Sequence, residues 1–269
     1  MQSEKLTGSV YDLAAQLPLN ETDTLFFSSD ITRLVQFEKS QGKSFDVQRF
    51  IDSFIVCLPK GNVIFPAYND NLKNNAVFNW NQTKPNTGAL SNKAFKRKDF
   101  MRSQDPLHSV LIHGVDANHV TELNDESTFG PNSVFAFMDS KKGKMLFIDT
   151  TLNQSFTYLH YLEEKWRVSY RKYYTKKLTY IRNDKSQTKY VKFYTKKPGL
   201  MANIEKFEAH LIQKGIVKLY DFNGITLRFL NFEDINREAK EYLEKGGKFY
   251  RFEWKFLFRS IVKILLKRT

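Results

Sequence analysis

The stretch that decides the fold is residues 145–164, which read MLFIDTTLNQSFTYLHYLEE. The apolar run Met145–Ile148 predicts a buried strand, because four consecutive apolar side chains suit a strand that is covered on both faces. The polar residues that follow predict a turn into a helix, with Asn153 or Ser155 as its N-cap.

Two residues of that helix form a candidate catalytic pair. His160 and Glu163 lie three positions apart, so they share one helix face and can touch. A carboxylate beside an imidazole raises its basicity and fixes which ring nitrogen carries the proton. The spacing therefore favours a general base just beyond a strand, although a surface pair without chemistry has the same spacing.

Composition bounds the class of protein. The chain of 269 residues is long enough for one large domain or two small ones, and 41% hydrophobic residues allow a sizeable core. Cys57 is the only cysteine, which excludes an intramolecular disulfide and fits a reducing, cytoplasmic location. The first residues lack the pattern of a signal peptide, and no apolar run reaches about 18 residues, so we expect neither a signal peptide nor a transmembrane helix.

The formal net charge of +13 is concentrated after residue 140, especially in 165–197 and 245–268. Such a charge favours anionic partners: phosphorylated small molecules, an anionic membrane surface or nucleic acid. A non-catalytic nucleic-acid-binding protein is therefore one hypothesis, but no nucleic-acid-binding motif is recognisable and we expect no such partner. The histidines lack the spacing of metal ligands, so we expect no metal.

The periodicity of the chain predicts a mixed α/β domain. Strands are expected at 24–28, 63–68, 110–113, 145–148, 166–171, 177–182, 190–195, 217–222 and 225–232. Helices are expected at 9–16, 45–58, 89–98, 200–214 and 233–245. Asn183-Asp184 and Asn223-Gly224 are hairpin turns. Since neither a repeat nor a linker is present, residues 1–247 are predicted to form a single domain.

Residues 248–269 have a different pattern. Plotted as a helix, residues 249–267 place large apolar side chains on one side and lysines and arginines in a neighbouring arc. A basic amphipathic helix of this kind lies on an anionic membrane surface. A terminal helix that docks on its own core or in a dimer has the same pattern, and the sequence leaves both readings open.

Two polar clusters next to strands are further site candidates. Ser28 and Ser29 end the strand at 24–28, where hydroxyls and backbone N–H groups are often presented to a phosphate or carbonyl. Residues 101–109, MRSQDPLHS, gather polar side chains ahead of the strand at 110–113. A helix cap in the first case and a solvated loop in the second are the structural alternatives.

Three of these segments, in order, resemble the aminoglycoside 3-N-acetyltransferase family, also called antibiotic N-acetyltransferases. Residues 102–109 resemble its R-S-x-H-P-x-x-S motif, residues 130–133 its G-x-G-S-P turn, and residues 143–163 its G-K-x-L-L-L-G-x-x-x-N-x-x-T-x-L-H-x-x-E motif. Asp105 stands in place of one family histidine and Phe27 in place of another. The similarity reaches from about residue 20 to 247 and implies a single mixed-sheet α/β/α sandwich.

The resemblance also implies a reaction, acyl transfer from acetyl-coenzyme A or another acyl-coenzyme A to an amine. His160 matches the family's base and Glu163 the carboxylate that orients it. The residues implied along the coenzyme path are Ser28, Ser29, Arg102, Ser103 and Ser109. Those implied near the acceptor are Asp105, His108 and Asn153.

Charge bears on the choice of acceptor. Aminoglycosides are polycations, and an enzyme for them gains from acidic surface, whereas this chain is strongly basic. We therefore expect the amine of a nucleotide-linked amino sugar in surface polysaccharide synthesis, in the cytoplasm or at the inner membrane face. Aminoglycoside acetylation, and thus antibiotic resistance, is the alternative. The sequence is compatible with a monomer or a homodimer.

Overall fold

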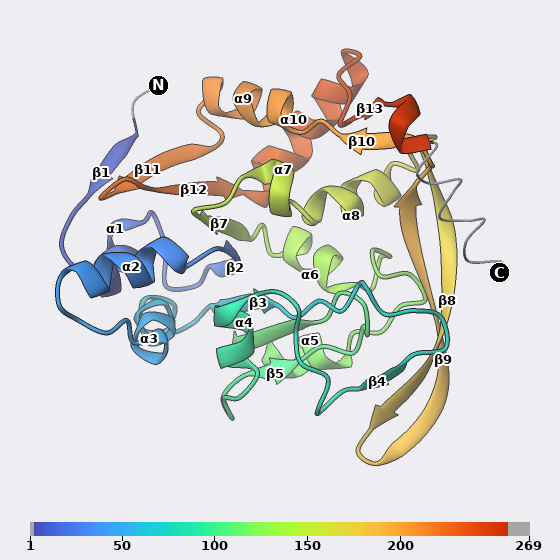
Figure 1. Ribbon diagram of the computed structural model, residues 1–269, viewed down its shortest axis with the longest axis horizontal. Helices are drawn as coiled ribbons and strands as arrows, with labels where there is room; N and C mark the ends of the chain where they lie inside the picture. The colour runs from blue at the N-terminus through green and yellow to red at the C-terminus, as the bar shows by residue number, and fades with distance from the viewer. Residues whose placement is uncertain (1–2, 258–269) are drawn as a thin grey trace.

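A computed structural model describes residues 3–257, and a mixed eight-stranded sheet lies at its centre (Figure 1). The strands of this sheet, in spatial order, are β1 (Glu4–Leu6), β11 (Lys218–Phe222), β12 (Ile225–Asn231), β7 (Lys144–Ile148), β2 (Thr24–Ser29), β3 (Asn62–Pro66), β6 (Val110–Gly114) and β5 (Met101–Arg102). The central strand β2 pairs parallel with both β3 and β7. The strand predicted at 145–148 is confirmed.

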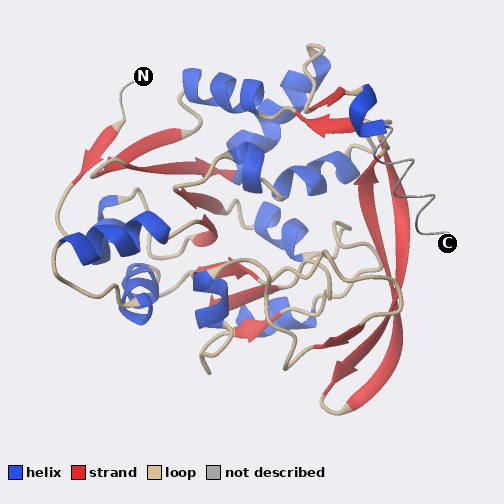
Figure 2. Ribbon diagram, viewed as in Figure 1, coloured by secondary structure: helices blue, strands red, loops and turns tan. Residues whose placement is uncertain are grey.

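Side chains of the central strands enter two separate cores. In β7, Met145 and Phe147 belong to one apolar cluster, while Leu146 and Ile148 belong to another. Successive side chains of a strand point to opposite faces, so the sheet is covered on both sides. Figure 2 shows helices on both sides of the strands. The predicted α/β/α sandwich is confirmed.

Each face carries its own set of helices. The first face is covered by the 3₁₀ helix Val10–Asp12 and by α1 (Leu13–Gln16), α2 (Thr32–Ser40), α3 (Val47–Cys57) and α4 (Ala89–Ala94). The second is covered by α5 (Ala117–Glu122), α6 (Val134–Ser140), α7 (Leu152–Ser155), α8 (Tyr158–Lys165), α9 (Glu205–Gln213) and α10 (Phe232–Glu244). No helix within residues 3–257 combines the length and apolar character needed to cross a membrane.

A long hairpin flanks the second face. Its strands β8 (Arg171–Arg182) and β9 (Lys185–Lys196) pair antiparallel over their whole length, and the short strand β4 (Val77–Asn79) joins its edge (Figure 1). The three separate strands expected at 166–171, 177–182 and 190–195 were therefore wrong in extent. Residues 166–170 form turns, and the polar run after Arg171 is strand because each residue has a partner across the hairpin.

The predicted C-terminal helix begins as a strand. Tyr250–Phe252 form β13, which pairs antiparallel with β10 (Leu200–Ala202), so both segments are extended where a helix was expected. Burial accompanies this pairing: Phe249, in the bend just before β13, is fully buried against Phe207, and Tyr250 at the start of β13 is buried as well. Residues 254–257 are helical. The rest of the predicted helix, residues 258–267, lies outside the described residues.

Candidate active site

The turn after β7 and the two short helices beyond it build one wall of the site. Asp149 adopts a positive φ of 49°, and Thr151 and Gln154 then form a capping box that starts α7. The expected N-cap, Asn153 or Ser155, was wrong, because both already lie inside α7. At Phe156 the chain leaves helical geometry, and α8 begins two residues later.

The predicted pair on α8 is in contact. His160 Nδ1 lies 3.1 Å from Glu163 Oε2, one helical turn away. The His160 side chain is 30% exposed, whereas that of Glu163 is completely buried. The histidine can therefore meet a substrate, while the carboxylate can act only through its neighbours.

The surroundings of Glu163 show residues that the sequence did not reveal. Tyr170 donates its hydroxyl to Glu163 Oε1 at 2.8 Å, and Arg171 Nε lies 2.6 Å from Glu163 Oε2. Arg171 Nη2 also reaches His160 Nδ1 at 2.7 Å. These contacts join α8 to the start of β8, and they could not be read from helix spacing because Arg171 follows a turn after α8 ends.

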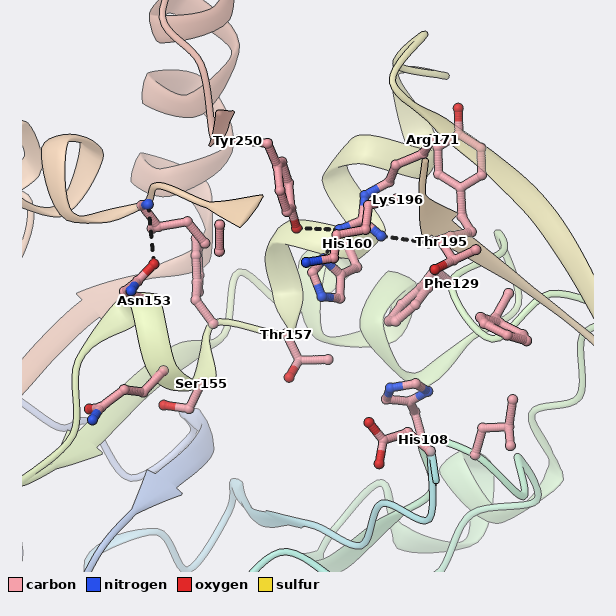
Figure 3. A pocket seen from close by; sticks show the side chains of 18 of the residues that line it. His108, Phe129, Asn153, Ser155, Thr157, His160, Arg171, Thr195, Lys196 and Tyr250 are labelled. Carbon is pink, nitrogen blue, oxygen red and sulfur yellow. Dashed lines mark hydrogen bonds between the residues drawn. The ribbon is translucent and has the colours of Figure 1, made fainter. Parts of the chain in front are cut away.

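Two further strands complete this cluster (Figure 3). Arg171 Nη1 donates to the carbonyl oxygen of Tyr194 in β9 at 2.6 Å, and Nη2 donates to the hydroxyl of Tyr250 in β13. Lys196 of β9 lies with its Nζ 5.7 Å from the Tyr250 ring centroid. The guanidinium is thus held by groups from α8, β9 and β13.

The electrostatics of the cluster keep His160 neutral. Burial lowers the pKa of His160 below its usual value, and the positive charge of Arg171 lowers it further, which together outweigh the opposing effect of Glu163. Burial and Arg171 also lower the pKa of Lys196. A neutral imidazole at neutral pH is the form that can accept a proton.

A cavity of about 350 Å³, here called the histidine cavity, opens beside this cluster. His160 and His108 line it from two sides, and the Phe129 ring lies beside both, at centroid distances of 5.7 and 5.0 Å (Figure 3). Its charged lining residues are Arg171, Lys176, Lys196 and Asp70. Three cations against one carboxylate give the cavity a positive lining.

A second cavity of about 340 Å³, here called the serine cavity, lies next to the first. It is lined by Ser28, Ser29 and Asp30 at the end of β2, and by Tyr68 and Thr87 from the loops after β3. The residues shared by the two cavities are Asp70, Gln154, Ser155 and Thr157. The α7–α8 segment is therefore the partition between them.

The structure places the predicted coenzyme residues in two groups. Ser28 and Ser29 line the serine cavity, as a binding role requires. Arg102, Ser103 and Ser109 are buried and are absent from the walls of both cavities. A direct contact of these three side chains with a coenzyme does not agree with their burial.

The contacts of Arg102 explain its burial. Its guanidinium donates to Ser109 Oγ at 2.9 Å and to Asn69 Oδ1 at 2.8 Å. It also donates to the carbonyl oxygens of Thr83 at 2.6 Å and Ala67 at 3.1 Å. Burial lowers the pKa of Arg102 to about 10. The motif thus fastens the 69–88 loop to the sheet, which is a structural role.

The predicted acceptor residues also divide. Asp105 Oδ1 accepts the backbone N–H groups of Leu107 and His108 at 2.7 and 2.6 Å, and Oδ2 accepts the Thr128 hydroxyl at 3.0 Å. Asp105 lies outside the histidine cavity and holds the backbone of His108, so these contacts favour a structural role for it over a contact with the acceptor. Asn153 lines the histidine cavity and donates to Glu205 at 2.7 Å.

His108 has an unusual environment for a histidine. Its ring packs against Tyr68 at 4.8 Å and against Phe129, and its buried Nδ1 has no hydrogen-bond partner among the described residues. Burial lowers its pKa to about 4. A buried ring nitrogen without a partner at a cavity wall can accept or donate one hydrogen bond to a bound molecule.

Comparison with known proteins gives one family. The model of the family described as "aminoglycoside 3-N-acetyltransferase" matches residues 29–244 of the chain. Comparison with curated protein sequences gives no match.

Several solved structures share the fold. AAC-IIIb in a binary complex with CoASH has a TM-score of 0.75 at 17% identity, over 89% of this chain and 97% of that one. AAC-VIa with bound sisomicin has a TM-score of 0.72 at 19% identity, over 90% of this chain and 100% of that one. YokD from Bacillus subtilis has a TM-score of 0.68 at 16% identity, over 87% of this chain and 96% of that one.

Proposed function

The chain belongs to the aminoglycoside 3-N-acetyltransferase family and is an acyl-coenzyme A-dependent N-acetyltransferase, and we propose that its acceptor is the amine of a nucleotide-linked amino sugar. The acyl group is acetyl or a related acyl group. We place the reaction in surface polysaccharide synthesis on the cytoplasmic side of the membrane.

The observation that carries this proposal is the charge of the histidine cavity. Arg171, Lys176 and Lys196 line it, against Asp70 alone among the acidic residues. A polycationic acceptor would meet three like charges there, whereas an acceptor with phosphates would be attracted. A nucleotide-linked amino sugar carries both the diphosphate that this lining favours and the amine that the reaction needs.

The serine cavity is the proposed site of acyl-coenzyme A, which supplies the thioester-bound acyl group. Hydroxyl-bearing side chains gather in its wall and can bond the amide groups of the coenzyme's arm: Ser28, Ser29, Thr87, Thr150, Ser155 and Thr157. The partition between the cavities is then the place where acyl group and amine meet. Its Ser155 and Thr157 hydroxyls, shared by both cavities, are the candidate donors to the oxyanion of the transition state.

His160 is the proposed general base. Only a neutral amine attacks a carbonyl, so a proton must leave the nitrogen during the reaction. In the tautomer that donates its Nδ1–H to Glu163, Nε2 keeps a lone pair and can take that proton. Glu163 stabilises the imidazolium that forms, and His160 then returns the proton to the departing thiolate. His108 and Asn153, on other walls of the histidine cavity, are the proposed acceptor contacts.

A thiol-release assay tests the proposal. Acetyl-coenzyme A is offered with a panel of nucleotide-linked amino sugars, with the corresponding free amino sugars and with kanamycin-type aminoglycosides. We expect turnover with the nucleotide-linked acceptors, and a loss of most of that turnover for the free sugars. Turnover confined to the antibiotics would overturn the proposed acceptor and leave the enzyme class intact.

Aminoglycoside acetylation is the second candidate, and family membership favours it. AAC-VIa was solved with sisomicin, and a mutant of AAC(3)-IVa was solved with apramycin. In the present chain Asp70 lines both cavities and is the acidic group that a cationic acceptor would meet. The acceptor panel decides between the two candidates.

A further inference from the structure

His160 Nδ1 has two competing partners. Glu163 Oε2 lies 3.1 Å away and Arg171 Nη2 lies 2.7 Å away. A carboxylate only accepts hydrogen bonds and a guanidinium only donates them. A neutral ring nitrogen either carries a proton or presents a lone pair, so it can satisfy one of these partners at a time.

Each partner selects a different neutral tautomer. The bond to Glu163 requires a proton on Nδ1 and leaves a lone pair on Nε2, which is the form that can act as a base. The bond from Arg171 requires the lone pair on Nδ1 and puts the proton on Nε2, which is a form that can only donate there. The contact between Arg171 and His160 therefore bears directly on proton transfer.

Arg171 is itself held firmly at this place. Its side chain is only 4% exposed, its Nε lies 2.6 Å from Glu163 Oε2, and its Nη1 donates to the Tyr194 carbonyl oxygen. Tyr250 accepts a hydrogen bond from Nη2 and also stacks its ring near the guanidinium, with 5.2 Å from Cζ to the ring centroid. These contacts fix the position of the Arg171 guanidinium beside His160 and Glu163. The side chain is therefore not free to move toward a bound substrate.

We propose that Arg171 is a positioning residue that keeps His160 unprotonated until the acceptor amine arrives, and that Tyr250 of the C-terminal strand β13 holds Arg171 in place. The inference rests on the proposed role of His160 as base. The step starts from the tautomer that donates its Nδ1–H to Glu163, and in that tautomer Arg171 acts on the ring through its charge and through its ion pair with Glu163. The amine nitrogen bonds to the acyl carbon, its proton moves to Nε2 and the carbon–sulfur bond breaks. The imidazolium formed beside Arg171 is destabilised by the like charge, which speeds return of the proton to the thiolate.

The charged and titratable groups that face His160 come from every element around it. They are Glu163 from α8, Arg171 from β8, Lys196 from β9, Tyr250 from β13, His108 from the segment before β6, and Asp70 and Lys176 on the cavity wall. Arg171 is the cation in direct contact with the ring, and the more distant Lys196 acts in the same direction. Replacing Arg171 by a neutral side chain leaves Glu163 as the dominant charge on the ring, so protonation of His160 becomes easier.

The test is an NMR titration of His160 together with the pH dependence of kcat/KM, in the wild-type chain and in Arg171→Met. His160→Ala identifies the resonance of His160. Arg97→Met is the matched control. Arg97 is a largely buried arginine that pairs with Asp52 and Asp99, and it lines neither the histidine cavity nor the serine cavity. We expect Arg171→Met to raise the midpoint of the His160 titration, and the acid limb of kcat/KM, by about one to three pH units, while Arg97→Met moves neither.

Two further variants separate charge from geometry. Arg171→Lys keeps the charge but loses the planar fork, so the titration midpoint should stay near that of the wild type while kcat falls. Tyr250→Phe keeps the ring and loses the hydroxyl, so it should shift the midpoint upward by less than Arg171→Met does. If Arg171→Met does not fold, Tyr250→Phe carries the test.

An unchanged His160 titration in folded Arg171→Met, or in Tyr250→Phe when the methionine variant does not fold, would overturn the inference. The titration needs no substrate, so this outcome is distinct from failure of the proposed acceptor. Conversely, if the titration shifts as expected but His160→Ala keeps full turnover, the role of His160 as base is what fails.

Discussion

Two polar segments of this chain were candidate sites, and the structure gives different roles to His160 in one and to Arg102 and Asp105 in the other. The α7–α8 segment presents His160 at a cavity, with one reactive nitrogen left for a substrate. The 101–109 segment, which is richer in polar residues, turns Arg102 inward to carbonyl oxygens and uses Asp105 to cap a turn. A dense polar cluster therefore does not identify a site. What distinguishes His160 from Arg102 and Asp105 is that one of its reactive atoms remains without an intramolecular partner. Within the 101–109 segment, His108 keeps such an atom at the cavity wall.

The buried arginines make the same contrast. Arg171 touches a carboxylate and an imidazole at a cavity wall, so its charge changes the chemistry of its neighbours. Arg102 bonds neutral acceptors: backbone carbonyl oxygens, an amide and a hydroxyl. We accordingly expect mutations in the α7–α8 region to change rates, and mutations of Arg102 to change stability.

The largest effect is expected at His160. His160→Ala should lower kcat by about 10²- to 10⁴-fold, the usual loss when a general base is removed. Its thermal unfolding should stay close to that of the wild type, because the side chain is partly exposed. Steady-state kinetics with thiol release measures this. Near-normal turnover would remove His160 from the mechanism.

The complementary change is Arg102→Met. It removes the donor to the Thr83 carbonyl oxygen and to Asn69 Oδ1, and it leaves the Ala67 carbonyl oxygen with the Ser109 hydroxyl alone, so we expect a loss of about 3 kcal/mol in the free energy of unfolding. Urea denaturation measures the loss. The folded fraction should keep its KM for acetyl-coenzyme A to within about two-fold. A large rise in that KM with unchanged stability would return Arg102 to the coenzyme site.

Local periodicity predicted the mixed α/β domain and the contact between His160 and Glu163, and the resemblance to the acetyltransferase family implied the sandwich. An entirely apolar strand such as Met145–Ile148 must send its side chains alternately into two cores, one on each face of the sheet. The contact between His160 and Glu163 follows from their separation of one helical turn. Arg171 and Tyr250 could not be found in this way. They reach His160 only because β8 and β13 fold back on α8, a long-range arrangement that spacing does not contain.

The errors have a common cause as well. Residues 172–177 are polar and Tyr250–Phe252 fit an amphipathic helix, yet both are strands because a partner strand pairs with them. Tertiary pairing outweighs local propensity in these segments. The burial of Arg102 could not be predicted for a related reason. It depends on the 69–88 loop, which folds over the side chain.

His108 offers a test through pH. Its pKa of about 4 lies below that of an unfolded histidine, so between pH 4 and 6.5 the unfolded state binds more protons and stability falls as pH is lowered. Between pH 7 and pH 5 this residue should remove about 2 kcal/mol of stability. His108→Phe should abolish that part of the acid sensitivity, as measured by urea unfolding at both pH values.

The same variant separates the two histidines by kinetics. If His108 contacts the acceptor, His108→Phe should raise the acceptor KM by about ten-fold and change kcat much less, because the loss is in binding. His160→Ala should show the reverse pattern. A fall in kcat for His108→Phe comparable to that for His160→Ala would contradict the assignment of binding to His108 and proton transfer to His160.

The smallest expected effect lies at the end of the chain. A chain that ends at Leu257 keeps Tyr250 and its bond to Arg171, so we expect its turnover to stay near that of the full chain. Its co-sedimentation with anionic liposomes should decrease if the basic residues 258–269 contribute to membrane contact. Undiminished liposome binding would exclude these residues as the source of membrane contact. Loss of turnover would show that these residues support the site.

The charge of the histidine cavity is the central claim, and one measurement tests it most directly. The ratio of kcat/KM for a nucleotide-linked amino sugar to that for a kanamycin-type aminoglycoside is determined for the wild-type chain and for Lys196→Glu. We predict a ratio well above one for the wild type, and a fall of about ten-fold or more when the cavity charge is reversed at this position. A wild-type ratio below one that Lys196→Glu leaves unchanged would contradict the account.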